Sequence, residues 1–277
     1  EEWFKCMSEN DLRLTLGASY VSRHEKDELI YATPQYRLNL PENVGAFDAR
    51  VKFGVGGFDL LAEYAYKAND PTASNGYIYK PGQVAMLSAS YSQKGLSFFL
   101  QAKRSDNFAF RTERSADPVS SSCYINYLPA FSYQHTYALA ALYPYATQLM
   151  GEWAFQGEIR YTWKRGTKMG GKYGTTLKLN ASHIRGTTDQ WFGMSEAPYY
   201  TDVNLELNKK LTKQWTIGAM AMYQTYNKQA IEGHGDLIHA GIGVVEAKYA
   251  LNKNIQMRGE VQYMYTKQDE GQWVAAL

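Results

Sequence analysis

The side chains best suited to catalysis or metal binding gather near the C-terminal end of the sequence. They are Glu232, His234, Asp236 and His239. Imidazole and carboxylate groups at short spacing can hold transition metals or transfer protons. Gly233 and Gly235 flank His234, however, and this composition is typical of a flexible loop tip. We therefore expect neither a metal site nor a catalytic residue there.

A second candidate for chemistry is Ser182 beside His183, with Asp236 and His239 further along the chain. A nucleophile and its base must lie within hydrogen-bond distance, and nothing in the spacing fixes that geometry for these residues. A hydrolase with its site at one rim of the fold is kept as an alternative. The main expectation is a protein without enzyme activity and without a cofactor.

Charged side chains form a larger set because they recur at every second position of otherwise apolar stretches. In Ile255–Tyr265, apolar residues such as Met257 and Val261 alternate with Arg258 and Glu260. This period of two predicts a β-strand with one apolar and one polar face. The stretch is long enough to cross a bilayer at a tilt, which needs about 9–11 residues.

The same alternation recurs along the whole chain and predicts an all-β fold, an antiparallel transmembrane β-barrel. About 12 strands are expected here, joined alternately by short turns and long loops, as in outer-membrane barrels. Short turns are expected near Gly56, Lys94, Gly170, Thr212 and Lys253, and long loops near Pro34, Pro71, residues 105–150, Trp191 and Gly233.

Two strands depart from the regular pattern. The apolar phase changes within Leu237–Tyr249, which predicts a β-bulge near Val244 and Val245. The last strand begins at Trp273 and the sequence stops at Leu277, within it. We therefore expect a fragment of a protein with about 14 or more strands, since barrel strand numbers are generally even.

The polar positions of these strands predict which charges face the barrel lumen. They are Arg13, Asp48, Arg50, Lys52, Asp59, Glu63, Lys103, Glu158, Arg160, Lys178, Glu206, Arg258 and Glu260; Lys67 belongs to the same pattern. In the simplest interpretation, these charges are solvated or paired with one another inside the barrel. The alternative is a constriction that selects ions, although the mixed signs argue against strong selectivity.

Large aromatic residues on the opposite parity are expected to form the girdles that mark the membrane interfaces. They are Trp153, Trp163, Trp215, Tyr263 and Tyr265. Trp153 and Trp163 bracket one strand, and at about 3.3 Å per residue, tilted, their separation matches an apolar band about 25 Å tall.

Composition excludes several other classes of protein. The chain of 277 residues is 45% hydrophobic and has a net charge of +2, so it lacks the basic face of a nucleic-acid-binding protein. No apolar run is long enough for a membrane helix. Two cysteines, Cys6 and Cys123, allow one disulfide or two thiols. The first residues do not resemble a signal peptide, which predicts a mature form or a fragment.

Residues 105–150 interrupt the strand pattern for longer than a simple loop between two strands requires. The second half of this stretch is aromatic and apolar, which argues against solvent disorder. Three roles are left open: a plug or lid over the barrel, a docking surface for a partner protein, or a separate hairpin. A short helix is expected at His135–Leu142.

Three stretches resemble an uncharacterised family of Bacteroidetes outer-membrane barrel proteins. They are INYLPA at 125–130, QHTYALAALYPYATQ at 134–148 and YTKQDEGQW at 265–273. The resemblance implies a signal peptide and further strands before residue 1, and further strands after residue 277. It implies no activity, substrate or catalytic residue.

Together these observations predict one barrel domain over residues 1–277, with the insertion at 105–150, in a bacterial outer membrane. The expected function is that of a structural or partner subunit of an outer-membrane complex. A passive or gated pore for small solutes and a rim hydrolase are the alternatives, and a soluble β-sandwich is the alternative fold. The expected partners are the lipid bilayer, lipopolysaccharide and other outer-membrane proteins contacted through 105–150, with no nucleic acid.

Overall fold

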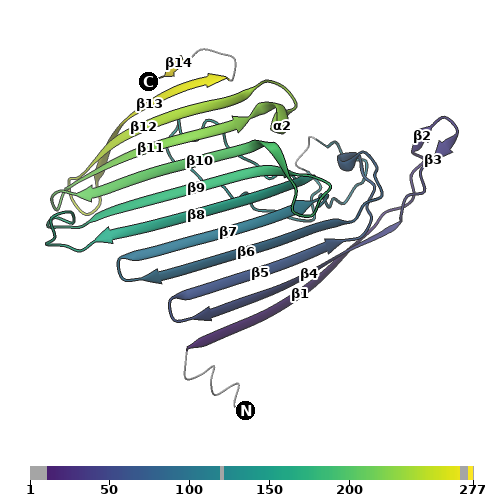
Figure 1. Cartoon of the computed structure of the whole chain (residues 1–277), viewed down its shortest axis with the longest axis horizontal. Coiled ribbons are helices and arrows are strands. Elements are labelled where there is room, and N and C mark those ends of the chain that lie inside the picture. Colours follow the sequence, from purple (N-terminus) through teal and green to yellow (C-terminus); the bar gives the residue numbers. More distant parts are fainter. Residues whose placement is uncertain (1–10, 119–121, 269–273, 277) are drawn as a thin grey trace.

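A computed structural model describes residues 11–118, 122–268 and 274–276. One 12-stranded antiparallel sheet forms the body of the protein, and every strand pairs with the next strand of that sheet along the chain (Figure 1). Its strands are β1 (Leu12–His24), β4 (Asn43–Val55), β5 (Phe58–Lys67), β6 (Gly82–Gln93), β7 (Leu96–Asp106), β8 (Gly151–Trp163), β9 (Thr175–Thr187), β10 (Met194–Lys210), β11 (Trp215–Asn227), β12 (Leu237–Ala250), β13 (Gln256–Gln268) and β14 (Val274–Ala276). The prediction of an all-β antiparallel fold is confirmed.

The described residues outside this sheet contain little regular structure. The regular elements there are the small hairpin of β2 (Tyr31–Thr33) and β3 (Tyr36–Arg37), the 3₁₀ turn η1 (Ala73–Asn75) and the helix α2 (Lys228–Glu232). The β2–β3 hairpin projects beyond the sheet (Figure 1). Within the described ranges, no helix has the length and apolar character needed to cross a membrane.

Continuous pairing gives the sheet two chemically different faces. Val51, Ala62, Leu87 and Ala102 lie side by side on one face, which we call the outer face. The opposite, inner face carries Asp202 and the residues that pair with it. Because side chains alternate along a strand, an unbroken register keeps each apolar set on a single face.

The connections differ at the two ends of the sheet. Short turns follow β4, β6, β10 and β12, and a longer Lys- and Gly-rich connection follows β8 at the same end. Gly56 adopts a positive φ of 53° in the first of these turns, a conformation that favours glycine. The loops after β1, β5, β7, β9 and β11 gather at the other end, which we call the loop end (Figure 1).

The predicted β-bulge in β12 is absent, since Leu237 to Tyr249 pair with β11 without a break. The change of phase has another cause: Ile242 and Val244 face inward and are buried against Tyr137, Leu139 and Ala140, so the inner face is itself apolar there. The register shifts that do occur lie between β9 and β10, around Pro198.

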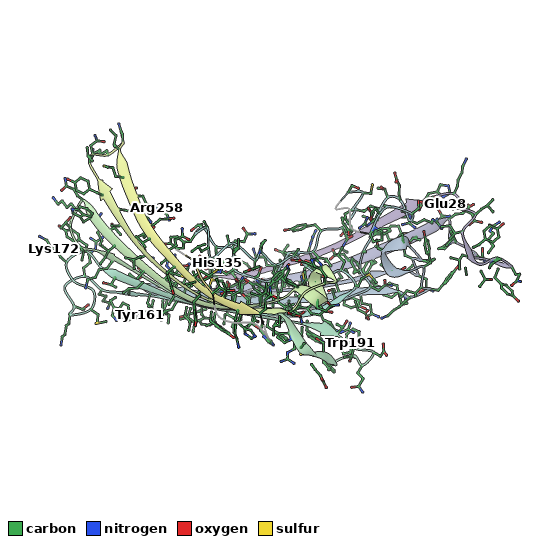
Figure 2. The ribbon with its side chains drawn as sticks, turned by 90° about the horizontal axis from the view of Figure 1, so that it is seen from above. Glu28, His135, Tyr161, Lys172, Trp191 and Arg258 are labelled. Carbon is green, nitrogen blue, oxygen red and sulfur yellow. The ribbon has the colours of Figure 1, made fainter. Side chains whose placement is uncertain are left out.

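The sheet is strongly curved but not closed, because β1 and β14 form its two edges (Figures 1 and 2). β14 comprises Val274–Ala276, whereas Trp273 and Leu277, the expected limits of the last strand, lie outside the described residues. The described residues form one large sheet rather than the two stacked sheets of a sandwich.

Candidate functional site

The segment between β7 and β8 lies across the inner face of the sheet. We call residues 107–118 and 122–150 the inner segment. In the view of Figure 2, His135 of this segment and Arg258 of β13 lie on the concave side, whereas Tyr161 and Trp191 point to the convex side. Residues Tyr137 to Leu142 form a turn, with the Ala141 nitrogen 3.0 Å from the Tyr137 oxygen, so the predicted helix is wrong.

A buried ion pair at the start of β8 anchors the end of the inner segment. The Lys103 ammonium lies 2.8 Å from a Glu152 carboxylate oxygen, and both side chains are fully buried. Lys103 also donates to the Pro129 carbonyl at 2.5 Å and to the Thr147 hydroxyl at 3.0 Å. Buried charges are costly unless they are paired and hydrogen-bonded, and here the segment supplies the additional partners.

Glu152 receives two further hydrogen bonds from the inner segment. The Tyr145 hydroxyl donates to it, and so does the Gln148 backbone nitrogen, at 2.7 Å. Burial and the neighbouring Glu152 charge raise the pKa of Tyr145 well above its ordinary value, so this hydroxyl remains a donor. The Tyr145 ring packs on Tyr200 with centroids 5.3 Å apart.

A second anchor joins the middle of the segment to β10. His135 Nε2 lies 2.6 Å from Asp202 Oδ2, and both side chains are almost completely buried. Asn204 donates to the other Asp202 oxygen at 3.0 Å. Gln224 of β11 donates to the Tyr143 carbonyl at 3.0 Å. Polar groups of neighbouring strands thus bind both side-chain and backbone atoms of the segment.

A third anchor lies at the loop end near β1 and β5. Asp70 accepts hydrogen bonds from Arg23 at 2.8 Å and Lys67 at 3.1 Å, and all three side chains are buried. Arg23 also donates to the Arg111 carbonyl at 3.0 Å. Both cations lie within 6 Å of the Phe110 ring, where its face attracts them.

Arg114 extends this third anchor towards β1. Its guanidinium lies 3.1 Å from Glu25, the residue that follows β1, and donates to the Pro41 carbonyl at 2.9 Å. The carbonyl of Arg114 in turn accepts from the Ala73 nitrogen at 2.8 Å. The inner segment therefore contacts both the connection that precedes β4 and the connection that follows β5.

The opposite end of the inner segment reaches β12 and β13. Ala140 is buried with Met220, Ile242 and Met264, and Tyr137 and Leu139 pack against this cluster. The Leu139 nitrogen donates to the Gln262 side chain at 2.9 Å. The segment therefore spans from the first strands of the sheet to β13.

The charges predicted to face the lumen share the inner face, the same face as the inner segment. Several are paired: Lys103 with Glu152, Lys178 with Glu206 at 2.7 Å, and Arg258 with Glu246 at 2.8 Å. Tyr137, which lies near Arg258, has a raised pKa, first because it is buried and then because Glu246 and Glu206 are close.

Asp48, Arg50 and Glu63 line a cavity of about 220 Å³ between the first strands and the inner segment. Its opposite wall is apolar and includes Phe108 and Phe110. Arg13 and Asp59, 3.5 Å apart, lie beyond the segment and are largely exposed. Coverage of the inner face is therefore least complete near β1.

The aromatic residues predicted as girdles all lie on the outer face, in two groups. Trp163 and Trp215 are near the short turns, whereas Trp153, Tyr263 and Tyr265 are near the loop end. Other rings on this face follow the same division; Trp215, for example, packs on Tyr249 with centroids 4.8 Å apart. Small and aliphatic residues lie between the two groups.

The histidines considered for catalysis are not brought together. Ser182 faces inward and its neighbour His183 outward. His239 lies on the outer face, where its ring contacts the Tyr223 hydroxyl at 2.9 Å. His234 is exposed, 3.7 Å from Glu232. Within the described ranges, no three His, Cys, Asp or Glu side chains are grouped to hold a metal ion.

The predicted choice between one disulfide and two thiols involves Cys6, which lies outside the described residues. Cys123 belongs to the inner segment and is partly buried. It precedes Tyr124, which forms an isolated β-bridge with Arg111.

The residues that anchor the inner segment are absent from the sequence-based prediction, apart from the inward-facing charges of Lys67 and Lys103. A signal was present for Asp202, because it continues the polar parity of Asn204 and Glu206 in its strand. Gln224 follows the apolar inward residues Met220 and Met222, so its strand gives no such signal. No comparable pattern marks His135 or Tyr145, whose partners are distant in the sequence.

Comparison with known proteins places these observations in a family. A family model described as a family of unknown function, DUF6029, matches residues 1–277. A search of curated proteins finds no match.

Proposed function

Because the chain belongs to DUF6029, a family of unknown function, its role has to be argued from the molecule itself. We propose that it is a non-enzymatic outer-membrane β-barrel protein whose interior is occupied by the inner segment. In this proposal it acts as a structural subunit of an outer-membrane complex rather than as an open channel.

The observation that carries the proposal is the difference between the two faces. Leu16, Leu100, Val245 and Val261, on strands across the sheet, are each more than half exposed on the outer face. Soluble monomers rarely expose an apolar patch larger than a few hundred Å². Lipid-facing apolar residues that alternate with polar residues on an inner face are typical of membrane barrels.

Two features add to this observation. The aromatic groups at both ends of the outer face match the interfacial girdles of membrane barrels. The alternation of short turns and long loops matches the two sides of such a barrel.

The proposal of a closed subunit rests on how the inner segment is held. Its aromatic and apolar side chains pack against the inner face, and three anchors containing buried charges fix it there. A segment held in this way obstructs a lumen. The partially covered region near Arg50 favours the second candidate, a narrow pore for small solutes.

Planar-bilayer conductance discriminates between these two candidates. A closed subunit is expected to be silent, and replacement of residues 109–147 by a flexible linker is expected to create steady ohmic channels. Steady channels in the unmodified protein would instead support the pore.

Membrane insertion itself is tested with spin labels at four sites in reconstituted vesicles. Labels at Ile159 and Val261, on the outer face, are expected to be relaxed by lipid-soluble oxygen more strongly than labels at Arg160 and Glu260. Equal accessibility of both pairs to oxygen would refute the proposed membrane location.

A further inference from the structure

We propose that the outer face of β7–β10 binds one acyl lipid of the surrounding leaflet through its anionic phosphate headgroup. This inference rests on the proposed membrane location. The site combines an apolar groove for an acyl chain with the guanidinium of Arg185 at the loop end of the same groove.

The groove is a concavity of about 500 Å³ on the outer face. Its floor consists of small side chains: Ala102, Gly157 and Ala181 occupy adjacent strands, and Leu100 and Val203 border them. These small residues amid larger ones create a depression on the outer face. The exposed atoms of this depression are almost entirely carbon.

The polar end of the groove is formed by His183 and Arg185 of β9. His183 lines the groove and contacts the Thr201 hydroxyl through Nδ1 at 2.9 Å. Its Nε2 accepts a hydrogen bond from Arg185 Nε at 2.9 Å. His183 therefore orients the guanidinium at the point where the apolar surface ends.

Arg185 carries a charge that the protein does not neutralise locally. Its Nη1 donates to the carbonyls of Ser195 and Glu196, at 3.1 and 3.0 Å. Among the described residues, no ion pair joins its guanidinium to a carboxylate, and Nη2 forms no hydrogen bond. This nitrogen can donate charge-assisted hydrogen bonds to a phosphate oxygen.

A second arginine lies in the same row of the sheet. Trp153 pairs with Arg104 on one side and Arg185 on the other. Arg104 shares its charge with Asp106 at 3.6 Å and lies 4.2 Å from the centroid of the Trp191 ring. Arg104 itself is buried, so Arg185 is the cation that a headgroup can reach at this level.

Charge and shape together identify an amphiphilic occupant. Successive rows on one face are about 6.6 Å apart, so Arg185 lies one row beyond the apolar groove. A lipid with a phosphate headgroup fills both parts at once, whereas inorganic phosphate leaves the groove empty. A neutral or zwitterionic lipid lacks the net negative charge that matches Arg185.

Native mass spectrometry of the full chain in detergent measures this preference. The probes are phosphatidic acid with two 14-carbon chains, phosphatidylcholine with the same chains, and inorganic phosphate. One phosphatidic acid is expected to bind about tenfold more tightly than phosphatidylcholine, whose choline cation offsets the phosphate charge that would pair with Arg185. Millimolar inorganic phosphate is not expected to displace it.

Two variants separate the parts of the site. Arg185→Gln is expected to remove the preference for phosphatidic acid, with Arg165→Gln, at the opposite end of the sheet, as its control. Ala181→Phe fills the groove and is expected to lower binding of both lipids. Ala49→Phe, on the outer face of β4, is its control.

Three results would overturn the inference. They are equal binding of the two lipids by the unmodified chain, undiminished binding by Ala181→Phe, and displacement by inorganic phosphate, which would indicate a simple anion site. Insertion into vesicles without lipid preference would overturn this inference alone. Failure to insert would refute the proposed function as well.

Discussion

At the scale of single residues, a small set of charged side chains is buried where the inner segment meets the sheet. Lys103, Glu152 and Asp202 are fully buried between the sheet and the inner segment, and each has two or more polar partners. Charges with this many partners hold a segment at one position, because any shift leaves an unpaired charge in an apolar environment.

Loss of one member of such a pair is expected to be costly. Lys103→Met leaves Glu152 without its cation and is expected to lower the free energy of unfolding by about 3–5 kcal/mol. Arg13→Met, in the exposed pair with Asp59, is expected to cost about 0–1 kcal/mol. Urea unfolding in detergent measures both values, and the double variant Lys103→Met, Glu152→Gln should recover much of the loss. Equal effects of the two single variants would contradict the role given to Lys103.

The Tyr145 hydroxyl predicts a pH limit for the inner segment. Its pKa is raised in the folded protein, first by burial and then by Glu152, so folding favours the neutral phenol. The resulting stabilisation is complete below the unfolded pKa of about 10 and is lost as the pH rises above it. We therefore expect the inner segment to be released from the sheet above about pH 10, and limited proteolysis measures this release.

The Tyr145→Phe variant tests the origin of that limit. It removes the donor to Glu152 and is expected to cost about 1 kcal/mol at neutral pH, while weakening the alkaline dependence. Tyr127→Phe is the control, because Tyr127 is 85% exposed. An unchanged alkaline transition in Tyr145→Phe would assign the limit to other groups.

At the scale of elements, alternation along the strands was readable from sequence, but its exceptions were not. The charged positions of strands such as β4, β8 and β13 share one face, as an unbroken period of two requires. In β12 the same rule failed, because Ile242 and Val244 face inward as apolar residues. Their partners lie in the inner segment, more than a hundred positions earlier in the chain, and a local pattern cannot contain that information.

The turn at Tyr137–Leu142 has a similar explanation. Its alanine- and leucine-rich sequence favours a helix by propensity. In the structure, Leu139 and Ala140 instead bind Gln262 and the buried methionines of β11 and β13. Tertiary packing has overridden local preference in this segment.

Two adjacent valines of β12 test the assignment of faces. Val244 is 2% exposed under the inner segment, whereas Val245 is 64% exposed on the outer face. In detergent, Val244→Asn is expected to speed proteolysis of the inner segment, because it places an unsatisfied amide in the buried cluster. Val245→Asn is expected to leave that rate unchanged. Similar rates for the two variants would show that the segment does not depend on the inner face of β12.

At the scale of the whole molecule, the two ends of the sheet are distinct enough to predict a sidedness. In bacterial barrels the short turns face the periplasm and the long loops face outward. Single cysteines at Gly233, in the connection after β11, and at Lys253, in the turn after β12, lie at opposite ends. With Cys6 and Cys123 replaced, an impermeant maleimide on intact cells is expected to label position 233 and to spare position 253.

Permeabilised cells supply the control for this labelling, since both positions should then react. Preferential labelling of position 253 on intact cells would reverse the orientation, and labelling of both would argue against a transmembrane location. The net charge of the chain is close to zero and does not predict its orientation.

The breadth of the inner segment has a consequence for assembly. Through Arg114 it is tied to the residue after β1, and through Leu139 to β13, although it is encoded between β7 and β8. Because the inner segment is bound near both edges of the curved sheet, it limits how far apart those edges can lie. We infer that the inner segment helps to set the curvature of the sheet, so that its removal would change the distance between β1 and β13.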